Sequence, residues 1–230
     1  MGTGLLLFLS VGAAACDRET LVEQSGPASR RAYEREAIGW TRWALAQPHS
    51  TGSPISDPTG ELCGVGQSGS VWYLAGTFGG PVERTCDVPA HKYLFFPLIN
   101  RWGIFLEEFY ASEQEFIDFL TEYFAANRAA TCQLMLRLDG EDLVSDELEE
   151  LDEALYVDVL EPFDVDINPD NWATQYGFEG GVTPMLTDGH FALLRPLEPG
   201  VHTLEFGGTV CDGEVIDFET SAIYTLNVED

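Results

Sequence analysis

Residues Tyr156–Asn168, with the sequence YVDVLEPFDVDIN, alternate between apolar and polar side chains over most of their length. A period of two predicts a β-strand that has one face in a core and the other in solvent. The same alternation recurs near the C-terminus, in Ala222–Val228. The residues expected to face inward are Val157, Val159, Phe163, Val165 and Ile167 in the first strand, and Ala222, Tyr224, Leu226 and Val228 in the last. These two stretches predict a mostly β protein.

Further strands are predicted before and between these two. The nearly continuous apolar run Tyr93–Ile99 indicates a buried strand, and Thr131–Leu138 indicates another. Gly189–Arg195 and Val201–Phe206 flank a segment with two prolines and a glycine, which predicts a hairpin. The expected fold class is therefore mostly β (α+β), a disulfide-stapled β-sandwich or jelly-roll-like domain with one or two helical insertions.

Two segments have helical periodicity instead. Residues 34–47 predict a short amphipathic helix that ends before Pro48. Ser112–Glu115 form a capping box, which predicts a helix from there to about Asn127. The side chains expected to be buried are Ile38, Trp40, Trp43, Ala44 and Leu45 in the first helix, and Phe116, Phe119, Leu120, Tyr123 and Phe124 in the second. The acidic residues 145–154 predict an exposed helical turn or loop.

The N-terminus resembles an export signal. Residues 5–15 form an apolar run that is too short to span a bilayer and that ends in small side chains. Cys16 follows directly, and the junction VGAAAC resembles the lipobox of bacterial lipoproteins, in which the cysteine receives a lipid and becomes the new N-terminus. We therefore expect a signal peptide at 1–15, a flexible tether at 16–36 and a single β-rich domain at 37–230. The membrane is then the expected partner, on the periplasmic or exterior side of the cell envelope.

Four cysteines remain after Cys16, and an even number in an exported chain predicts two disulfides with three possible pairings. The segment between Cys63 and Cys86 has the apolar–turn–apolar pattern of a hairpin. A bond across its base is local, which leaves Cys132 to pair with Cys211. Zinc binding is the alternative role for these thiols, but no Cys-x-x-Cys pair or nearby His has the spacing that a zinc site requires.

The chain is strongly acidic, with 39 Asp and Glu against 11 Lys and Arg and a net charge of −28. Nucleic-acid binding depends on neutralisation of phosphates by Lys and Arg, so this balance excludes nucleic acid as a partner. Lys92 is the only lysine. A carboxylate-rich surface suits a salty medium, where cations screen self-repulsion. Binding of divalent cations is the alternative explanation.

A calcium loop is the most specific metal site that the sequence offers. The oxygens of Asp164, Asp166, Asn168 and Asp170 recur with the odd-position spacing of such loops. Pro169 stands where the loop needs a glycine, and position 12 is Gln175 rather than Glu. The apolar residues between these oxygens fit a half-buried strand better. We therefore expect no bound cofactor, with calcium as the alternative.

Several motifs resemble a family of secreted bacterial proteins of uncharacterised function. They are Trp40–Leu45, Cys63–Gly69, Val71–Gly76 with Cys86, Phe95–Asn100, and Asp188–Gly189 followed by Pro199–Leu204. Together they frame residues 40–228. The resemblance implies an exported domain with a Cys63–Cys86 bond, and it implies no activity and no catalytic residue. Cys132 and Cys211 lie outside the shared pattern.

No catalytic signature stands out in the sequence. His190 and His202 fall on one face of the predicted hairpin, but they lie too far apart along it to chelate one metal. The leading interpretation is an envelope lipoprotein with a non-enzymatic binding or structural domain, whose protein or carbohydrate partner is open. The alternative is a hydrolase that acts on a polysaccharide or another polymer in a cleft lined by Trp72, Trp102 and Trp172. A calcium-binding surface protein is the third interpretation.

The lipid anchor leads to a direct prediction. The change Cys16→Ala removes the only thiol at the signal junction, so the chain should lose its lipid and its processed form. Mass spectrometry of the N-terminal peptide and detergent phase partitioning measure both properties. A wild-type chain whose mature N-terminus lies at another residue would contradict the prediction.

Overall fold

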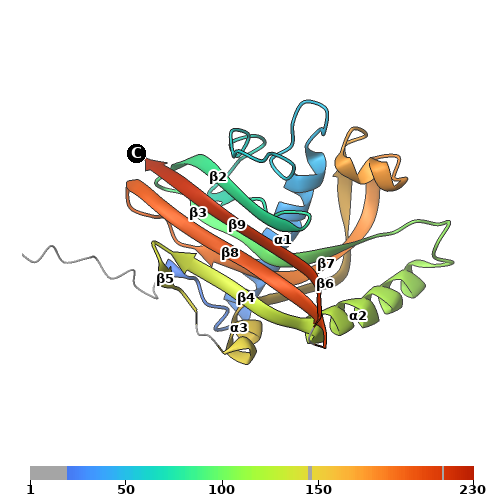
Figure 1. The fold of residues 1–230 in the computed structure, drawn as a ribbon. Coiled ribbons are helices and arrows are strands. Elements are labelled where there is room, and N and C mark those ends of the chain that lie inside the picture. Colours follow the sequence, from blue (N-terminus) through green and yellow to red (C-terminus); the bar gives the residue numbers. More distant parts are fainter. Residues whose placement is uncertain (1–19, 145–146, 214) are drawn as a thin grey trace, which may run out of the picture.

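The computed structural model describes residues 20–144, 147–213 and 215–230, and its strands form two sheets (Figure 1). The first sheet has the order β1-β3-β7-β6, with β1 Val71–Tyr73, β3 Tyr93–Ile104, β7 Gly181–Leu194 and β6 Tyr156–Ile167. The second has the order β2-β9-β8-β4-β5, with β2 Gly80–Pro89, β9 Val215–Glu229, β8 Gly200–Asp212, β4 Thr131–Leu138 and β5 Glu141–Asp142. The helices are α1 Pro27–Ala46, α2 Glu113–Ala130, α3 Leu148–Leu155 and the 3-10 turn η2 Trp172–Tyr176. The predicted mostly β, disulfide-containing α+β class is confirmed.

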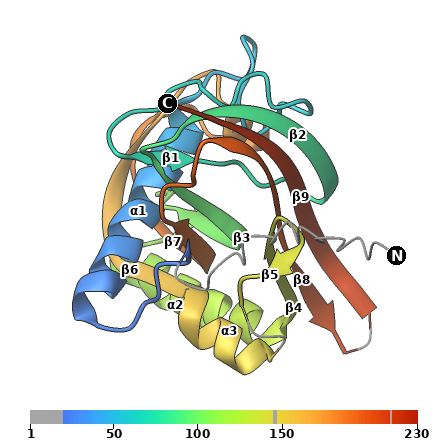
Figure 2. The ribbon, with the colours of Figure 1, turned by 90° about the vertical axis from the view of Figure 1, so that its left-hand side faces the viewer.

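The two sheets pack face to face around an apolar core, where the rings of Phe96 on β3 and Phe206 on β8 lie 4.4 Å apart. The alternating residues of β9 point into this core, and those of β6 point to the opposite side of the first sheet, against α1. All nine side chains predicted to face inward on these two strands are buried. Figure 2 shows the consequence: α1 covers the outside of the first sheet, while α2 and α3 lie together at one end of the layers.

The first helix begins earlier than the sequence indicated. Pro27 occupies its first turn, a position that proline favours, and the Ser29 hydroxyl accepts a hydrogen bond from Gly26 N at 3.1 Å. Tyr33 is fully buried and donates to the carbonyl of Val22 at 2.6 Å. The prediction of a flexible tether at 16–36 is therefore wrong from residue 20 onward, because Leu21 bridges Leu194 and Tyr33 anchors α1 to the domain.

The second helix begins at the predicted capping box, with the Ser112 hydroxyl accepting from Glu115 N at 3.2 Å. Phe116, Leu120 and Phe124 are buried as expected. Phe119 and Tyr123 are 55% and 45% exposed, so the prediction of their burial is wrong. The acidic 145–154 segment contains α3, as its pattern allowed. In the described part of the chain, no helix is both long and apolar enough to cross a membrane.

Both predicted hairpins are absent, because their strands belong to different sheets. β1 pairs in parallel with β3, and β2 pairs in parallel with β9. β7 and β8 also lie in separate sheets, so His190 and His202 do not share a face. The linker between β7 and β8 contributes the buried Leu197 to the core between the layers. Alternation cannot distinguish such a crossover from a tight turn, since both leave the same pattern in each strand.

The disulfides are nevertheless the two pairs expected from the sequence. Cys63 is bonded to Cys86 with a Cα–Cα distance of 5.8 Å, and Cys132 to Cys211 with 5.9 Å. The first bond fixes the 50–70 loop to β2, and the second joins the start of β4 to the end of β8. The first bond therefore ties a loop to the second sheet, and the second bond links two neighbouring strands within that sheet.

The motif around Cys63 has a structural role. The Gln67 amide donates to the carbonyls of Cys63 and Tyr73, at 2.9 and 2.8 Å, and accepts from Tyr73 N at 2.9 Å. Gly66 has φ +69°, and a Cβ there would lie 2.4 Å from the Gln47 amide nitrogen. Both residue types are therefore required by the turn that leads into β1.

A buried arginine holds the long loop against the second sheet. Arg84 on β2 is 5% exposed. Its guanidinium donates to the carbonyls of Asp57, Ala75, Gly76 and Ile55 and to the Tyr224 hydroxyl, at 2.7 to 3.1 Å. The three guanidinium nitrogens thus bond five acceptors from three segments of the chain.

The change Arg84→Met should destabilise the protein by roughly 3 kcal/mol, because it leaves several buried carbonyls without a donor. Urea unfolding followed by tryptophan fluorescence measures this loss. Arg31→Met, the same change at an exposed position of α1, is the control and should stay within about 0.5 kcal/mol of wild type. Equal effects of the two variants would contradict the role given to Arg84.

Candidate functional site

A cluster of charged side chains lies on the inner face of the first sheet. Asp188 and His190, two residues apart on β7, are both fully buried. Arg101 is the register partner of Asp188 on β3, and Tyr156 is the register partner of His190 on β6. The pairing of β3, β7 and β6 therefore brings these four side chains together.

Asp188 is held by two donors. Arg101 donates through Nε to Oδ1 at 2.8 Å and through Nη2 to Oδ2 at 2.7 Å. The Tyr156 hydroxyl donates to Oδ2 at 3.0 Å. Burial raises the pKa of the Asp188 carboxyl above its usual range, and the bonds from Arg101 and Tyr156 oppose that rise. Burial and the nearby Asp188 carboxylate also raise the pKa of Tyr156, which keeps its hydroxyl a donor.

The helices extend this cluster toward the surface. His190 Nε2 lies 2.8 Å from Asp152 Oδ1 on α3. Arg128 on α2 donates to the same carboxylate through Nε and Nη2, at 2.6 to 3.1 Å. The Arg128 guanidinium also lies over the Tyr156 ring, 3.8 Å from its centroid. Asp152 therefore links α2, α3 and β7.

The pKa of Asp152 reflects these contacts. Burial alone would raise it, but the hydrogen bonds from His190 and Arg128 outweigh burial and lower the pKa to about 2. Asp152 is therefore ionised at neutral pH. His190 Nδ1 is buried and has no hydrogen-bond partner in the described part of the chain.

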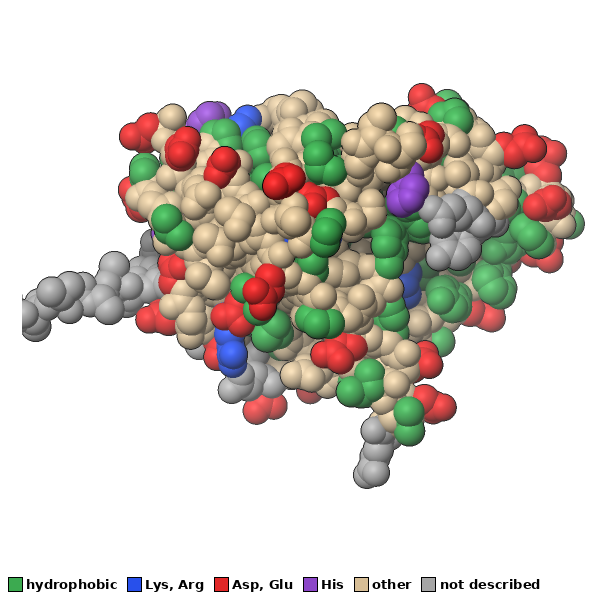
Figure 3. All heavy atoms as spheres, turned by 45° about the horizontal axis from the view of Figure 1, so that its top comes forward, with side chains coloured by type: hydrophobic (Ala, Val, Ile, Leu, Met, Phe, Trp, Pro, Cys, Tyr) green, Lys and Arg blue, Asp and Glu red, His purple; other side chains and the backbone are tan. Residues whose placement is uncertain are grey.

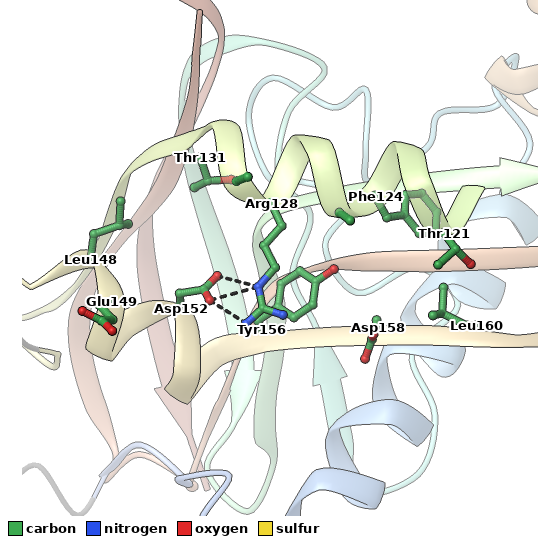
Figure 4. A pocket seen from close by; sticks show the side chains of 12 residues that line it. Thr121, Phe124, Arg128, Thr131, Leu148, Glu149, Asp152, Tyr156, Asp158 and Leu160 are labelled. Atoms are coloured by element: carbon green, nitrogen blue, oxygen red, sulfur yellow. Dashed lines mark hydrogen bonds and ion pairs between the residues drawn. The ribbon is translucent and has the colours of Figure 1, made fainter. Parts of the chain in front are cut away.

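A pocket of about 630 Å³ opens between α2, α3 and β6, above this cluster (Figure 4). Arg128, Asp152 and Tyr156 form its polar centre. Its other lining residues are Thr121, Phe124, Ala125, Ala129 and Thr131 from α2 and the start of β4, Leu148 and Glu149 from α3, and Asp158 and Leu160 from β6. The volume lies in the range of small-molecule sites, and the alanines of α2 leave the space open.

The two threonine hydroxyls that line this pocket are bonded to the backbone of α2. The hydroxyls of Thr121 and Thr131 donate to the helix carbonyls of Ile117 and Asn127, at 2.7 and 3.1 Å. Neither hydroxyl therefore pairs with His190 or Asp152 as a base.

The residues of the proposed calcium loop are separated by the structure. Asp164 and Asp166 point to solvent from β6, where the predicted strand is confirmed. Asn168 donates to the Ala46 carbonyl at 3.1 Å, and Asp170 accepts from Ser50 N at 3.1 Å. Both thus fasten their loop to the end of α1. Among the described residues, no three His, Cys, Asp or Glu side chains form a group that could hold a metal ion.

The three tryptophans do not line one cleft. Trp102 and Trp172 stack with centroids 5.6 Å apart beside a cavity of about 310 Å³, and Trp40 and Phe78 contact them at 5.6 and 4.3 Å. Trp72 packs against the other core. No Asp or Glu is among the described residues that line this cavity. The combination of tryptophans and carboxylates expected for a polymer hydrolase is not present there.

Sequence reasoning missed the six residues of the charged cluster, Arg101, Arg128, Asp152, Tyr156, Asp188 and His190. They come from five separate elements, so no local motif joins them. One signal was available: Asp188 and His190 are ionisable residues within a stretch of β7 that is buried throughout and mostly apolar. The Cys16 lipidation site lies outside the described residues.

No protein-family model, no curated protein and no solved structure matches this chain.

The change Asp152→Asn tests the charged cluster through pH. A carboxyl with a pKa of about 2 in the folded protein, against about 3.9 when unfolded, stabilises the fold above pH 4 and loses this contribution as the pH falls to 2. We expect the variant to be about 1 to 2 kcal/mol less stable at pH 6, after allowance for solvent screening. The deficit should vanish near pH 2 in urea unfolding. Asp164→Asn, at an exposed carboxyl of β6, is the control, and a deficit that persists unchanged at pH 2 would refute the assignment.

Proposed function

We propose that this protein is an exported lipoprotein of the cell envelope whose domain binds a small, partly apolar molecule in the α2–α3–β6 pocket. The signal-like residues 1–15 and Cys16 support export and lipid attachment. The two disulfides support an oxidising compartment outside the cytoplasm.

The observation that carries the binding function is the fixed polar centre of the pocket. Arg128 is held by Asp152 on one side and by the Tyr156 ring below. Asp152 is held in turn by His190, and Tyr156 by Asp188. A ligand therefore meets groups whose positions are already set, and this lowers the entropy lost on binding. Apolar walls with a few oriented polar groups are the usual composition of such sites.

Binding is favoured over catalysis because the carboxylate at the centre of the pocket and its two threonine hydroxyls are already occupied. The Asp152 carboxylate accepts from both Arg128 and His190, which leaves it poorly placed as a general base. The Thr121 and Thr131 hydroxyls are directed to helix carbonyls. The leading interpretation of the sequence, a non-enzymatic binding domain, agrees with this geometry.

A pocket-filling variant tests the proposal. The mature chain, residues 16–230 with Cys16→Ser so that no lipid is attached, should bind the neutral fluorescent probe N-phenyl-1-naphthylamine saturably. Ala125→Trp places an indole in the pocket and should weaken binding at least about 10-fold, which corresponds to 1.4 kcal/mol. Fluorescence titration measures both constants.

Ala126→Trp is the matched control. It makes the same change one residue along α2, at an exposed position outside the pocket lining, and should bind the probe as wild type does. Absence of saturable binding by the wild-type chain, or equal binding by all three chains, would refute the α2–α3–β6 pocket as the ligand site.

A further inference from the structure

The charges around the pocket do not cancel. Among the described residues that line it, Arg128 is the only basic one, and three are acidic: Glu149, Asp152 and Asp158. Arg128 and Asp152 form a bidentate ion pair, so each neutralises the other. Two carboxylates are then left over at the pocket.

These two carboxylates are unpaired within the described residues. The side chains of Glu149 on α3 and Asp158 on β6 are exposed and make no ion pair or hydrogen bond there, although the charge of Asp158 contributes to the raised pKa of the Arg128 guanidinium. Figure 4 shows them on either side of the Arg128–Asp152 pair, with Glu149 toward the α3 end and Asp158 toward Leu160. A ligand that lies across the pocket therefore has a free carboxylate near each end.

Two of the three elements that form the pocket, α3 and β6, contain no basic residue that could neutralise these carboxylates. The chain contains no Lys or Arg from residue 138 to residue 194, a stretch that includes all of α3 and β6. On the face shown in Figure 3, Asp and Glu side chains are likewise spread widely and Lys and Arg are few. The net charge of −28 adds an attractive potential for cations at any opening of the surface.

The remaining surface of the pocket suits an apolar body. Phe124, Leu148 and Leu160 provide its larger apolar side chains, and Ala125 and Ala129 leave room beside them. The Tyr156 ring already carries a cation on its face, the Arg128 guanidinium. Aromatic and carboxylate groups together are the surroundings in which proteins hold organic ammonium groups.

From the unpaired Glu149 and Asp158 beside these apolar walls, we infer that the pocket selects organic cations, amines with an apolar body, over neutral and anionic molecules of the same shape. This inference rests on the proposed binding function and assigns its ligand class. An anionic ligand would need Arg128, and drawing that guanidinium away from Asp152 would break the pair that closes the pocket floor. A cationic ligand leaves that pair intact.

Three naphthalenes of similar size separate charge from shape. 1-Naphthylmethylamine is a cation at pH 7, 1-naphthalenemethanol is neutral and 1-naphthoate is an anion. We expect the amine to displace N-phenyl-1-naphthylamine from the mature Cys16→Ser chain at a concentration about 5-fold lower than the alcohol, from exposed-pair energies at two carboxylates. Naphthoate should be the weakest of the three.

The variants Glu149→Gln and Asp158→Asn should each reduce the ratio between amine and alcohol, and the double variant should bring it close to one. Glu122→Gln removes one charge from α2 outside the pocket lining, and it should leave the ratio unchanged. A control that lowers the ratio as much as the pocket variants would show a general charge effect and overturn the inference.

The two proposals fail separately. If none of the three naphthalenes nor the neutral probe binds, the binding function itself is wrong. If the neutral probe binds and Ala125→Trp blocks it, but the alcohol or naphthoate equals the amine, the binding function stands and the ligand class is overturned.

Discussion

The charged cluster and the α2–α3–β6 pocket depend on the ion pair between Asp188 and Arg101. A fully buried carboxylate is strongly unfavourable unless charged and hydrogen-bonding partners surround it. Arg101 and Tyr156 meet that demand, and in doing so they fix the position of the Tyr156 ring. Arg128 then lies on this ring, and its pairing with Asp152 sets the distance between α2 and α3. The shape of the pocket therefore depends on the buried carboxylate of Asp188 on β7.

The parts of the fold that follow from local patterns could be predicted from the sequence. The alternation of β6 and β9 gave the correct buried faces, and the capping box at Ser112 gave the start of α2. Sheet membership could not be predicted, because β7 and β8 have strand patterns that say nothing about which partner each chooses. Tyr33 shows a second limit: one fully buried ring, fastened by a single hydroxyl, extends α1 into a segment whose composition is that of a tether.

The way in which the arginines are used explains why the surroundings of the charged cluster are so acidic. Arginine is the residue that can satisfy several buried acceptors at once, since its guanidinium has five donors in a fixed plane. Arg84 and Arg101 serve the interior in this way, and Arg128 is committed to Asp152. The chain has 39 acidic residues against 11 Lys and Arg, and no Lys or Arg lies between residues 138 and 194. The carboxylates at the pocket mouth therefore remain uncompensated, and an anion-binding role for Arg128 would have to overcome both its ion pair and this field.

If Cys16 carries the proposed lipid, the lipid and the pocket are closer than a long tether would allow. Leu21 forms a bridge with Leu194, and Arg195 N donates to the Thr20 carbonyl at 2.8 Å, so the domain begins at residue 20. With Cys16 as the lipid attachment site, four residues separate the lipid from the first sheet, a reach of at most about 14 Å. Leu21 and Leu151 line a hollow beside α3, the helix that also lines the ligand pocket. The pocket would then lie near the membrane surface, where anionic lipids concentrate cations and where apolar bodies partition. A site with unpaired carboxylates and apolar walls is suited to ligands that accumulate there.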